Sequence, residues 1–376
     1  MGITADVVAV DALDAVERLQ WREWQKSNPL TQSPFFRIEF TEAVARHAPQ
    51  CFVAKLMRAD RLLGYFPFQK RGGGVYPIGA PMNDYHGVIG PLEVAPTLEE
   101  VAAALKAIRL NVNGWVGKGS SGHEGQSCHV RLNEGYEAWL SERLAQYGKY
   151  FKDKARSRRS MEAQFGVVEV QVGLKQPDLL DRLIALKSAQ FKRTGRHDIF
   201  GVRWTRDLLH DLMQQGDGGF GASMATMSAG GELLAIEYSL HADGHYHFWF
   251  PVYLEAGARF SPGILLSMET MKALEPQGYS VFDYGFGDGG YKKYFVNSYQ
   301  PVREAFVVSG GLGNLGRRIG GRLLALAGSD RGERLKLSIY RRWSMIEASE
   351  VSHSGRVRGV ILAARRASGQ IFAGES

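Results

Sequence analysis

Residues 282–295 read FDYGFGDGGYKKYF and combine side chains that could move protons with four glycines. The residues just before this stretch favour a strand, and glycines allow positive φ angles or close approach of a ligand to the backbone. We therefore expect a strand that opens into a loop. Asp283 at the strand end could take a proton, Tyr291 could donate one, and Lys292 could contact an anion. The structural alternative is an ordinary turn followed by a packed tyrosine.

Two other stretches carry polar groups suited to the same chemistry. Glu237 lies in an otherwise apolar strand whose neighbouring residues point to the opposite face, and such a carboxylate could have a raised pKa that suits a general base. The turn-like MNDYHG contains Asp84, Tyr85 and His86, which the first half of the chain could present to an acceptor. A surface glutamate and ordinary turn residues are the alternatives.

A helix start follows the aromatic strand expected from His245 to Tyr253. Ser261-Pro262-Gly263 opens a helix through Leu274, because serine is a preferred N-cap residue and proline suits the first helical position. Free N–H groups and the positive end of the helix dipole favour a phosphate there, and Gly263 leaves the backbone open to a ligand. The pattern predicts a pyrophosphate site, although many ordinary strand–helix–strand connections look alike.

An internal repeat indicates how these residues are positioned. Residues 51–68 and 222–240 each contain an alternating strand, a short turn, a Leu-Leu pair and a second strand. The two Leu-Leu pairs, Leu62-Leu63 and Leu233-Leu234, are offset by 171 residues. Amphipathic helical segments precede both hairpins. The sequence therefore favours a duplicated α/β fold over one large domain.

Composition limits the class of protein. The 376 residues suffice for two compact domains, and no apolar run reaches the ~18 residues that a membrane helix needs. The N-terminus lacks a basic region of the secretory type, and Cys51 and Cys128 lie far apart. We expect a cytoplasmic protein with reduced cysteines and no metal. Basic residues gather between the two repeats, at 146–165, where phosphate contact or a solvated helix face are the alternatives.

The net charge of +7 is concentrated in residues 311–376, while residues 1–310 are neutral. Within that tail, Arg317, Arg318 and Arg322 accompany apolar residues at three-to-four spacing. Three interpretations remain open: an amphipathic helix on an anionic membrane, a site for an anionic regulator such as cyclic di-GMP, or a structural cap with solvated arginines. The neutral body argues against a nucleic-acid partner.

These residues together resemble the CelD-like acetyltransferases of bacterial exopolysaccharide synthesis, which are relatives of the Fem-type peptidyl transferases. The resemblance covers about residues 15–310 and rests on Leu233-Leu234-Ala235, on 261–266, and on Asp283, Gly285, Gly287, Asp288, Tyr291 and Lys292. One departure concerns the donor site: Arg259 to Gly263 lacks the strict Gln/Arg-x-x-Gly-x-Gly/Ala loop of single-lobe GNAT enzymes, which leaves the acyl donor open.

The resemblance implies an α/β (α+β) fold of two tandem GNAT-like lobes, each a mixed central sheet flanked by helices. The implied division is an N-terminal lobe at 1–145, a basic inter-lobe helix at 146–165, a C-terminal lobe with the donor site at 166–310 and a basic helical extension at 311–376. It implies acetyl-CoA as acyl donor, bound by Ser261, Gly263, Ile264 and Leu265.

The implied reaction is N- or O-acetylation of a saccharide, free or lipid-linked, with Glu237, Asp283 and Tyr291 as catalytic candidates. Asp84, Tyr85, His86 and Lys292 are the expected acceptor contacts. We expect a cytoplasmic enzyme that could also contact the inner membrane. Two alternatives stay open: a Fem-type transferase using aminoacyl-tRNA, and an inactive GNAT-like module that binds an anionic regulator.

Overall fold

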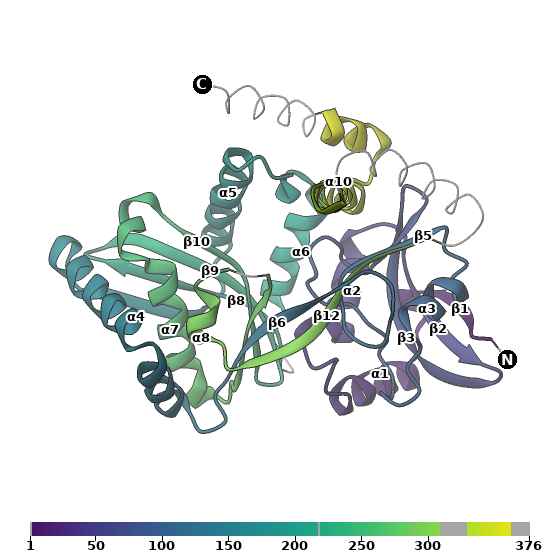
Figure 1. Ribbon diagram of the computed structural model, residues 1–376, viewed down its shortest axis with the longest axis horizontal. Helices are drawn as coiled ribbons and strands as arrows, with labels where there is room; N and C mark the ends of the chain where they lie inside the picture. Colours follow the sequence, from purple (N-terminus) through teal and green to yellow (C-terminus); the bar gives the residue numbers. More distant parts are fainter. Residues whose placement is uncertain (1, 217–218, 288, 309–328, 362–376) are drawn as a thin grey trace.

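A mixed sheet of twelve strands runs through the whole molecule (Figure 1). The computed structural model describes residues 2–216, 219–287, 289–308 and 329–361. In sheet order the strands are β1 (Thr4–Ala9), β2 (Cys51–Arg58), β3 (Arg61–Arg71), β4 (Gly74–Pro77), β5 (Arg109–Trp115), β12 (Ser298–Val308), β6 (His123–Arg131), β11 (Val281–Phe286), β10 (His245–Tyr253), β9 (Glu232–Ala242), β8 (Phe220–Ala229) and β7 (Val168–Leu174).

The sheet consists of two halves with the same strand pattern. In the first lobe, β1 to β5 follow one another and β12 completes the edge; in the second lobe, β7 to β11 follow one another and β6 completes it. Each half of the chain therefore gives its last strand to the other lobe. β6 and β12 pair antiparallel at the centre, where Figure 1 shows them side by side. The two-lobed mixed α/β fold expected from the sequence is confirmed.

The internal repeat is confirmed down to its irregularities. The β2–β3 hairpin has a register shift between Leu56 and Met57, and the β8–β9 hairpin has one between Met227 and Ser228. These positions are offset by the same 171 residues as the Leu-Leu pairs. Both turns use positive φ angles, at Ala59 in the first hairpin and at Gly230 and Gly231 in the second. A bulge conserved between two copies marks a feature of the fold rather than a local defect.

Helices cover both faces of the sheet, and their bounds are as follows: α1 (Ala15–Ser27), α2 (Ile38–His47), α3 (Leu98–Ala104), α4 (Tyr136–Phe165), α5 (Pro177–Arg193), α6 (Arg203–Gln214), α7 (Pro262–Leu274), α8 (Lys292–Phe295) and α10 (Ser329–Ser349). The largest apolar cluster joins the lobes, because α2 of the first packs against α6 and the inner face of β9 and β10 of the second. On the opposite face of the second lobe, α4 and α7 enclose a separate cluster. One shared core therefore fixes the lobes relative to each other.

The basic inter-lobe helix begins earlier than expected. α4 spans Tyr136–Phe165 and is interrupted at Tyr147, whose backbone is not helical. Its basic second half lies against the start of α7, where Lys154 Nζ donates to Ser261 Oγ at 2.9 Å. Arg158 forms ion pairs with Glu162 and Glu269. Part of the basic face of α4 therefore makes contacts with the second lobe, while the Arg156 side chain remains exposed.

The described part of the C-terminal extension packs across both lobes. Glu347 of α10 accepts hydrogen bonds from Tyr76 and Arg109 of the first lobe. On the second-lobe side, Trp204 Nε1 donates to the Ser349 carbonyl at 2.9 Å. This arrangement agrees with a structural role for residues 339–361. Arg317, Arg318 and Arg322 lie outside the described residues. No described helix has both the length and the apolar character needed to cross a membrane.

Candidate active site at the junction of the two lobes

A buried network of polar side chains lies where the lobes meet, and its centre is Asp283. This residue is fully buried on β11. Its Oδ1 accepts hydrogen bonds from Tyr85 Oη at 2.7 Å and from the Gly285 N–H at 2.7 Å. Its Oδ2 lies 3.1 Å from His247 Nδ1 and 3.2 Å from His245 Nε2. The carboxylate is therefore surrounded by donors from β10, from its own strand β11 and from the first-lobe loop.

The local backbone explains how Asp283 is held. The pairing of β11 with β6 shifts register between Asp283 and Phe286, and Gly285 within that bulge has a φ of +68°. Glycine adopts such angles without steric cost, and an aspartate often accepts the N–H two residues further along. The glycine-rich loop of the sequence is thus a bulge that anchors its own aspartate. Lys292 turns back on the same loop, since its Nζ donates to the Phe286 carbonyl at 3.0 Å.

His247 connects the buried acid to an accessible one. Its Nε2 donates to Asp84 Oδ2 at 2.9 Å, and the Asp84 side chain is 31% exposed. Burial alone would lower the pKa of His247, but the charges and hydrogen bonds of Asp283 and Asp84 outweigh it and raise that pKa to about 9. At neutral pH the arrangement is thus a protonated imidazole between two carboxylates. Asp84 is the member of this arrangement that reaches solvent.

Asp283 itself is ill suited to accept a proton. Burial would raise its pKa, but His247 and His129 outweigh that effect and hold the pKa well below the usual range. Its oxygens are also occupied, as the surrounding distances show. The geometry assigns it an orienting part, through His247, rather than direct contact with an acceptor. The sequence placed Asp283 at the strand end facing the cleft; the structure places it beneath Tyr85 and His247.

The first-lobe loop that carries Asp84 is fixed by backbone hydrogen bonds. The His86 N–H donates to the Gly114 carbonyl at 2.8 Å, and the Val116 N–H donates to the His86 carbonyl at 2.7 Å. Asn83 Nδ2 donates to the Ile78 carbonyl at 2.5 Å. Tyr85 is buried, and both burial and the charge of Asp283 raise its pKa well above the usual value. A rigid loop therefore delivers an accessible carboxylate to the second lobe.

His86 points away from this network despite being its sequence neighbour. Its Nε2 lies 2.6 Å from Asn113 Oδ1 on β5, and burial lowers its pKa to about 4. It is therefore neutral at physiological pH. The structure does not bring it into contact with Asp84, His247 or Asp283.

Glu237 and Tyr291 lie on the other face of the second-lobe sheet, beneath α7. Glu237 is 1% exposed and accepts a hydrogen bond from Thr270 Oγ1 of α7 at 2.8 Å. Burial raises its pKa to about 8, which is the direction expected from the sequence, and leaves it protonated at neutral pH. Tyr291 is exposed, and its ring packs edge-on against Tyr284. The expected catalytic residues are thus divided between two faces of the sheet.

The strands β10 and β11 separate next to the network. Their parallel pairing ends at His247 and Asp283, although β10 continues to Tyr253. Within the described residues this stretch of β10 has no strand partner on the β11 side, and its pairing with β9 shifts register between Phe248 and Phe250. Unpaired backbone groups along a strand edge can bind an extended amide chain. The gap between β10 and β11 begins beside His247, which binds Asp84.

The start of α7 lies beside a groove that could hold phosphates. Pro262 occupies the first helical position as expected, but Ser261 has a left-handed backbone and its side chain does not cap the helix. A side chain added at Gly263 would meet no atom within 4 Å, whereas Leu265 is buried in the core and Ile264 is partly buried. The groove, about 730 Å³, runs along α4 and includes Arg156, Ser157, Ser160 and Arg259, together with Asp153, which forms an ion pair with Arg156 at 3.3 Å.

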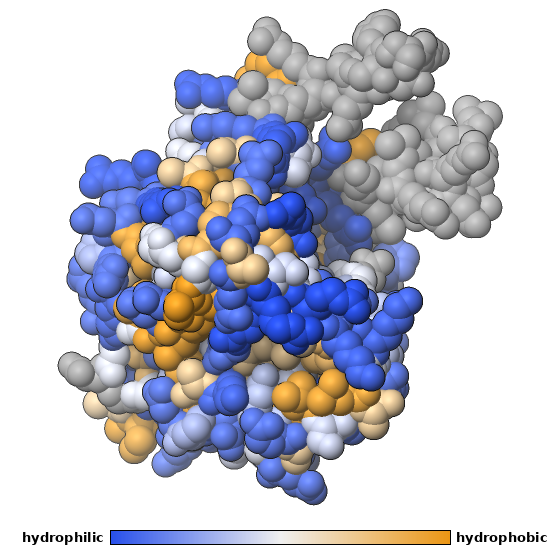
Figure 2. Space-filling view, turned by 90° about the vertical axis from the view of Figure 1, so that its left-hand side faces the viewer, coloured by the Kyte–Doolittle hydropathy of each residue, from blue (hydrophilic) through white to orange (hydrophobic). Residues whose placement is uncertain are grey.

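The outer side of the second lobe is predominantly polar. Figure 2 shows hydrophobic residues there in separate patches among hydrophilic ones. Within the described part of the chain, no cluster of three or more His, Cys, Asp or Glu side chains is arranged to hold a metal ion. The histidines and aspartates at the junction are joined by hydrogen bonds.

Four members of the network were not predicted from the sequence: His247, His245, His129 and Ser127. Their spacing along the strands could have revealed them. His245 and His247 are two residues apart on β10, and Ser127 and His129 are two residues apart on β6. Residues at such spacing share one face of a strand. Ser127 Oγ lies 2.5 Å from Tyr85 Oη and 2.6 Å from His129 Nε2, which completes the network.

Comparison with known proteins bears on the second lobe and on the fold. Residues 148–293 match the family model described as the acetyltransferase (GNAT) domain. The matched range includes β10, β11, α7 and most of α4. A search of curated proteins found no match.

Solved structures extend the likeness to both lobes. The chain is similar to the crystal structure of FemX, with 11% identity, a TM-score of 0.51 and coverage of 80% of this chain and 96% of that one. It also matches a tandem GNAT protein from the clavulanic acid biosynthesis pathway, with 12% identity, a TM-score of 0.45 and coverage of 82% and 99%. At these identities the FemX likeness shows the two-lobed fold.

Proposed function

We propose that this chain is an acyl-CoA-dependent acyltransferase whose active site is assembled from both lobes. The observation that carries the proposal is the contact between Asp84 of the first lobe and His247 of the second, beside the gap between β10 and β11. The GNAT match of the second lobe supports an acyl-CoA donor there. The acceptor would then approach from the side where Asp84 is exposed.

The donor would bind along the separated strands, with its diphosphate at the start of α7. Three features support this placement: an uncapped helix N-terminus, open space at Gly263, and the basic groove that includes Arg156. The acyl carbonyl would lie near the unpaired edge of β10, where backbone N–H groups can stabilise the developing oxyanion. When bound, acyl-CoA supplies the thioester and its thiolate leaving group.

In the proposed reaction the acceptor nitrogen or oxygen attacks the thioester carbon, a new acyl bond forms and the carbon–sulfur bond breaks. Asp84 takes the acceptor proton, because it is the exposed carboxylate of the network. Protonated His247 holds Asp84 in place, and Asp283 holds His247. Tyr291, on the donor face, is the proposed source of a proton for the thiolate. Tyr85 acts by positioning Asp283.

The acceptor class follows from the charge at the junction. An exposed carboxylate favours an amine, which must lose a proton before or during attack. We therefore propose N-acetylation of an amino sugar as the first choice, with O-acetylation second. A saccharide of exopolysaccharide or cell-envelope synthesis, free or lipid-linked, is the corresponding biological acceptor. Lys292 and His86 remain proposed acceptor contacts from the sequence, although the structure engages each with neighbouring protein groups.

The test is acetyl transfer from acetyl-CoA to a panel of amino sugars by the purified protein and its Asp84→Asn variant. We expect kcat to fall by about 10²–10⁴-fold in the variant, as for the loss of a general base, while CoA affinity stays within a factor of about two. Asp60→Asn, in the exposed β2–β3 turn of the same lobe, is the control. Equal turnover by Asp84→Asn and Asp60→Asn would exclude Asp84 as the base.

A further inference from the structure

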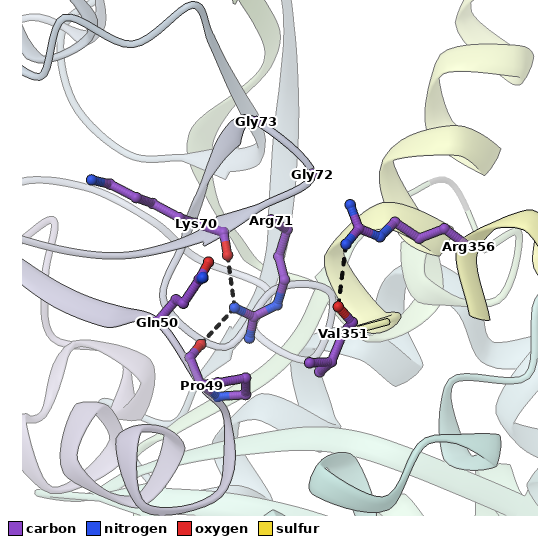
Figure 3. A pocket seen from close by; sticks show the side chains of 8 residues that line it. All are labelled: Pro49, Gln50, Lys70, Arg71, Gly72, Gly73, Val351 and Arg356. Atoms are coloured by element: carbon purple, nitrogen blue, oxygen red, sulfur yellow. Dashed lines mark hydrogen bonds between the residues drawn. The ribbon is translucent and has the colours of Figure 1, made fainter. Parts of the chain in front are cut away.

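A second hollow lies away from the junction, between the β3–β4 turn and the C-terminal helical segment 353–361 (Figure 3). Its volume is about 340 Å³. Lys70, Arg71 and the glycines of the turn form one wall, and Arg356 comes from the other. Neither the GNAT match nor the proposed reaction accounts for this hollow, because its lining residues lie outside the matched range 148–293. The hollow is thus built from the first lobe and the extension.

Arg71 is the unusual residue in this hollow. It is 3% exposed, and its Nη1 donates to the carbonyls of Pro49 at 2.6 Å and Lys70 at 2.8 Å. Among the described residues, its Nε and Nη2 have no hydrogen-bond partner, and the titratable side chain beside it is the Cys51 thiol, whose pKa burial raises to about 11. A buried guanidinium without an acidic partner is costly for the folded state. An anionic ligand would remove that cost.

Arg356 adds a second positive charge from across the hollow. Its hydrogen bonds go to carbonyls of its own segment, those of Val351 at 3.2 Å and Ser352 at 3.3 Å. Burial lowers the pKa of Arg71, and the neighbouring charge of Arg356 contributes in the same direction. Lys70 lies over the ring of Phe52 and is exposed. Arg71 and Arg356 thus face a space that an anion could fill, while the Lys70 ammonium points away from it.

The nearest acidic group is already engaged. Glu347 reaches the turn at Gly72, but its carboxylate accepts from Tyr76 and from Arg109 and is 2% exposed. Its ion pair is with Arg109, and Arg356 Nη1 approaches Gly72 beside the same carboxylate. The turn leaves room at Gly73, where φ is +82° and an added side chain would meet no atom within 4 Å, whereas Gly72 faces the Glu347 carboxylate and the Arg356 guanidinium. Backbone of this kind allows close approach of a ligand.

We propose that this hollow binds the phosphate group of a ligand and that binding ties the segment 353–361 to the first lobe. Guanidinium groups match phosphate oxygens in pairs, and two of them face one space here. The volume suits a phosphorylated headgroup or a nucleotide rather than a polymer. A soluble phosphorylated metabolite and an anionic lipid headgroup share this chemistry, so the experiment distinguishes them.

The first arm measures binding of inorganic pyrophosphate by calorimetry to the full chain and to Arg356→Ala. Arg356 is half-buried at the molecular surface, so the variant should fold; its melting curve checks this. We expect affinity to fall by about ten-fold or more, the loss of a charge-assisted hydrogen-bonding group. Arg61→Ala, exposed at the other end of β3, is the matched control. Arg156→Ala separates any pyrophosphate bound in the α4 groove.

The second arm replaces pyrophosphate with vesicles that contain phosphatidylglycerol. Vesicle binding that is lost in Arg356→Ala but kept in Arg61→Ala would identify a lipid headgroup, and loss in the pyrophosphate arm alone would identify a soluble ligand. In either case, hydrogen exchange at 353–361 should slow when the ligand binds. The proposal is overturned if Arg356→Ala and Arg61→Ala behave alike in both arms, whatever the acyl-transfer activity shows.

Discussion

The two lobes share a strand order but differ in what joins their central parallel strands. In the second lobe, β10 and β11 are joined by the segment that contains α7, a helix of 13 residues that begins beside a basic groove. In the first lobe, β4 and β5 pair parallel at one position, Val75 with Leu110, and the connection carries Asp84 and Tyr85 into the second lobe. The two copies of the fold thus carry different connecting segments between their parallel strands. In the proposed reaction the second lobe binds the donor, and the first supplies the exposed acid.

The largest effect on acyl transfer should come from displacing the first-lobe loop that carries Asp84. A side-chain carbon at Gly114 would lie 1.8 Å from the carbonyl oxygen of Asp84, so Gly114→Ala must displace the loop backbone. We expect acyl transfer to fall by about 100-fold or more, because a displaced catalytic group loses its geometry. The free energy of unfolding should drop by about 1–3 kcal/mol. Steady-state kinetics and denaturant titration measure both.

The matched control for that change is Gly125→Ala on β6. Its added carbon would meet Val302 Cγ2 at 3.8 Å, an ordinary contact. We expect near-normal stability and activity. If Gly114→Ala kept full activity while being destabilised, the position of Asp84 would be irrelevant to the reaction, and the first lobe would serve only as a scaffold.

A smaller effect is expected from a substitution at the proposed donor site at the start of α7. Gly263→Val places a side chain where no atom lies within 4 Å, so folding should be preserved. If the diphosphate binds at the start of α7, CoA affinity should weaken by about ten-fold through loss of contact with the helix N-terminus. Calorimetry with CoA gives the answer. Gly148→Val, also in open space but on α4, should bind CoA normally; unchanged affinity in both variants would move the donor elsewhere.

The charge state of His247 gives a pH-dependent prediction. Its pKa is about 9 in the folded protein and about 6.5 when unfolded, so its stabilising contribution is complete below about pH 6.5 and is lost as pH rises through about 9. The difference in unfolding free energy between the wild type and His247→Asn should therefore shrink by about 1 kcal/mol per pH unit between pH 7 and 9. Denaturant titrations across this range measure it. A pH-independent difference would mean that His247 is neutral.

The smallest effect is expected at Glu237. Because its pKa of about 8 leaves it protonated at neutral pH, Glu237→Gln keeps a neutral group that can accept from Thr270. We expect kcat at pH 7 to change by less than about three-fold. A loss of 100-fold would instead make Glu237 the base and place proton transfer on the α7 face of the sheet.

Local patterns predicted the parts of the molecule that are local in sequence. The two hairpins, the helix start at Pro262 and the strand with its glycine loop all follow from residue alternation and turn chemistry. The exchange of β6 and β12 did not follow, because it depends on which edges meet after both lobes form. The burial of Asp283 under Tyr85, 198 residues away, has the same origin. The histidine network was visible as alternation, but only strand pairing shows that its members share one site.

The most direct test of a site divided between the lobes is a crystal structure of the protein with CoA. We expect the diphosphate at the start of α7, near Gly263, and the thiol in the gap between β10 and β11, on the way to the Asp84 carboxylate. CoA bound between β4 and β5 of the first lobe, or with its thiol remote from Asp84, would contradict this expectation.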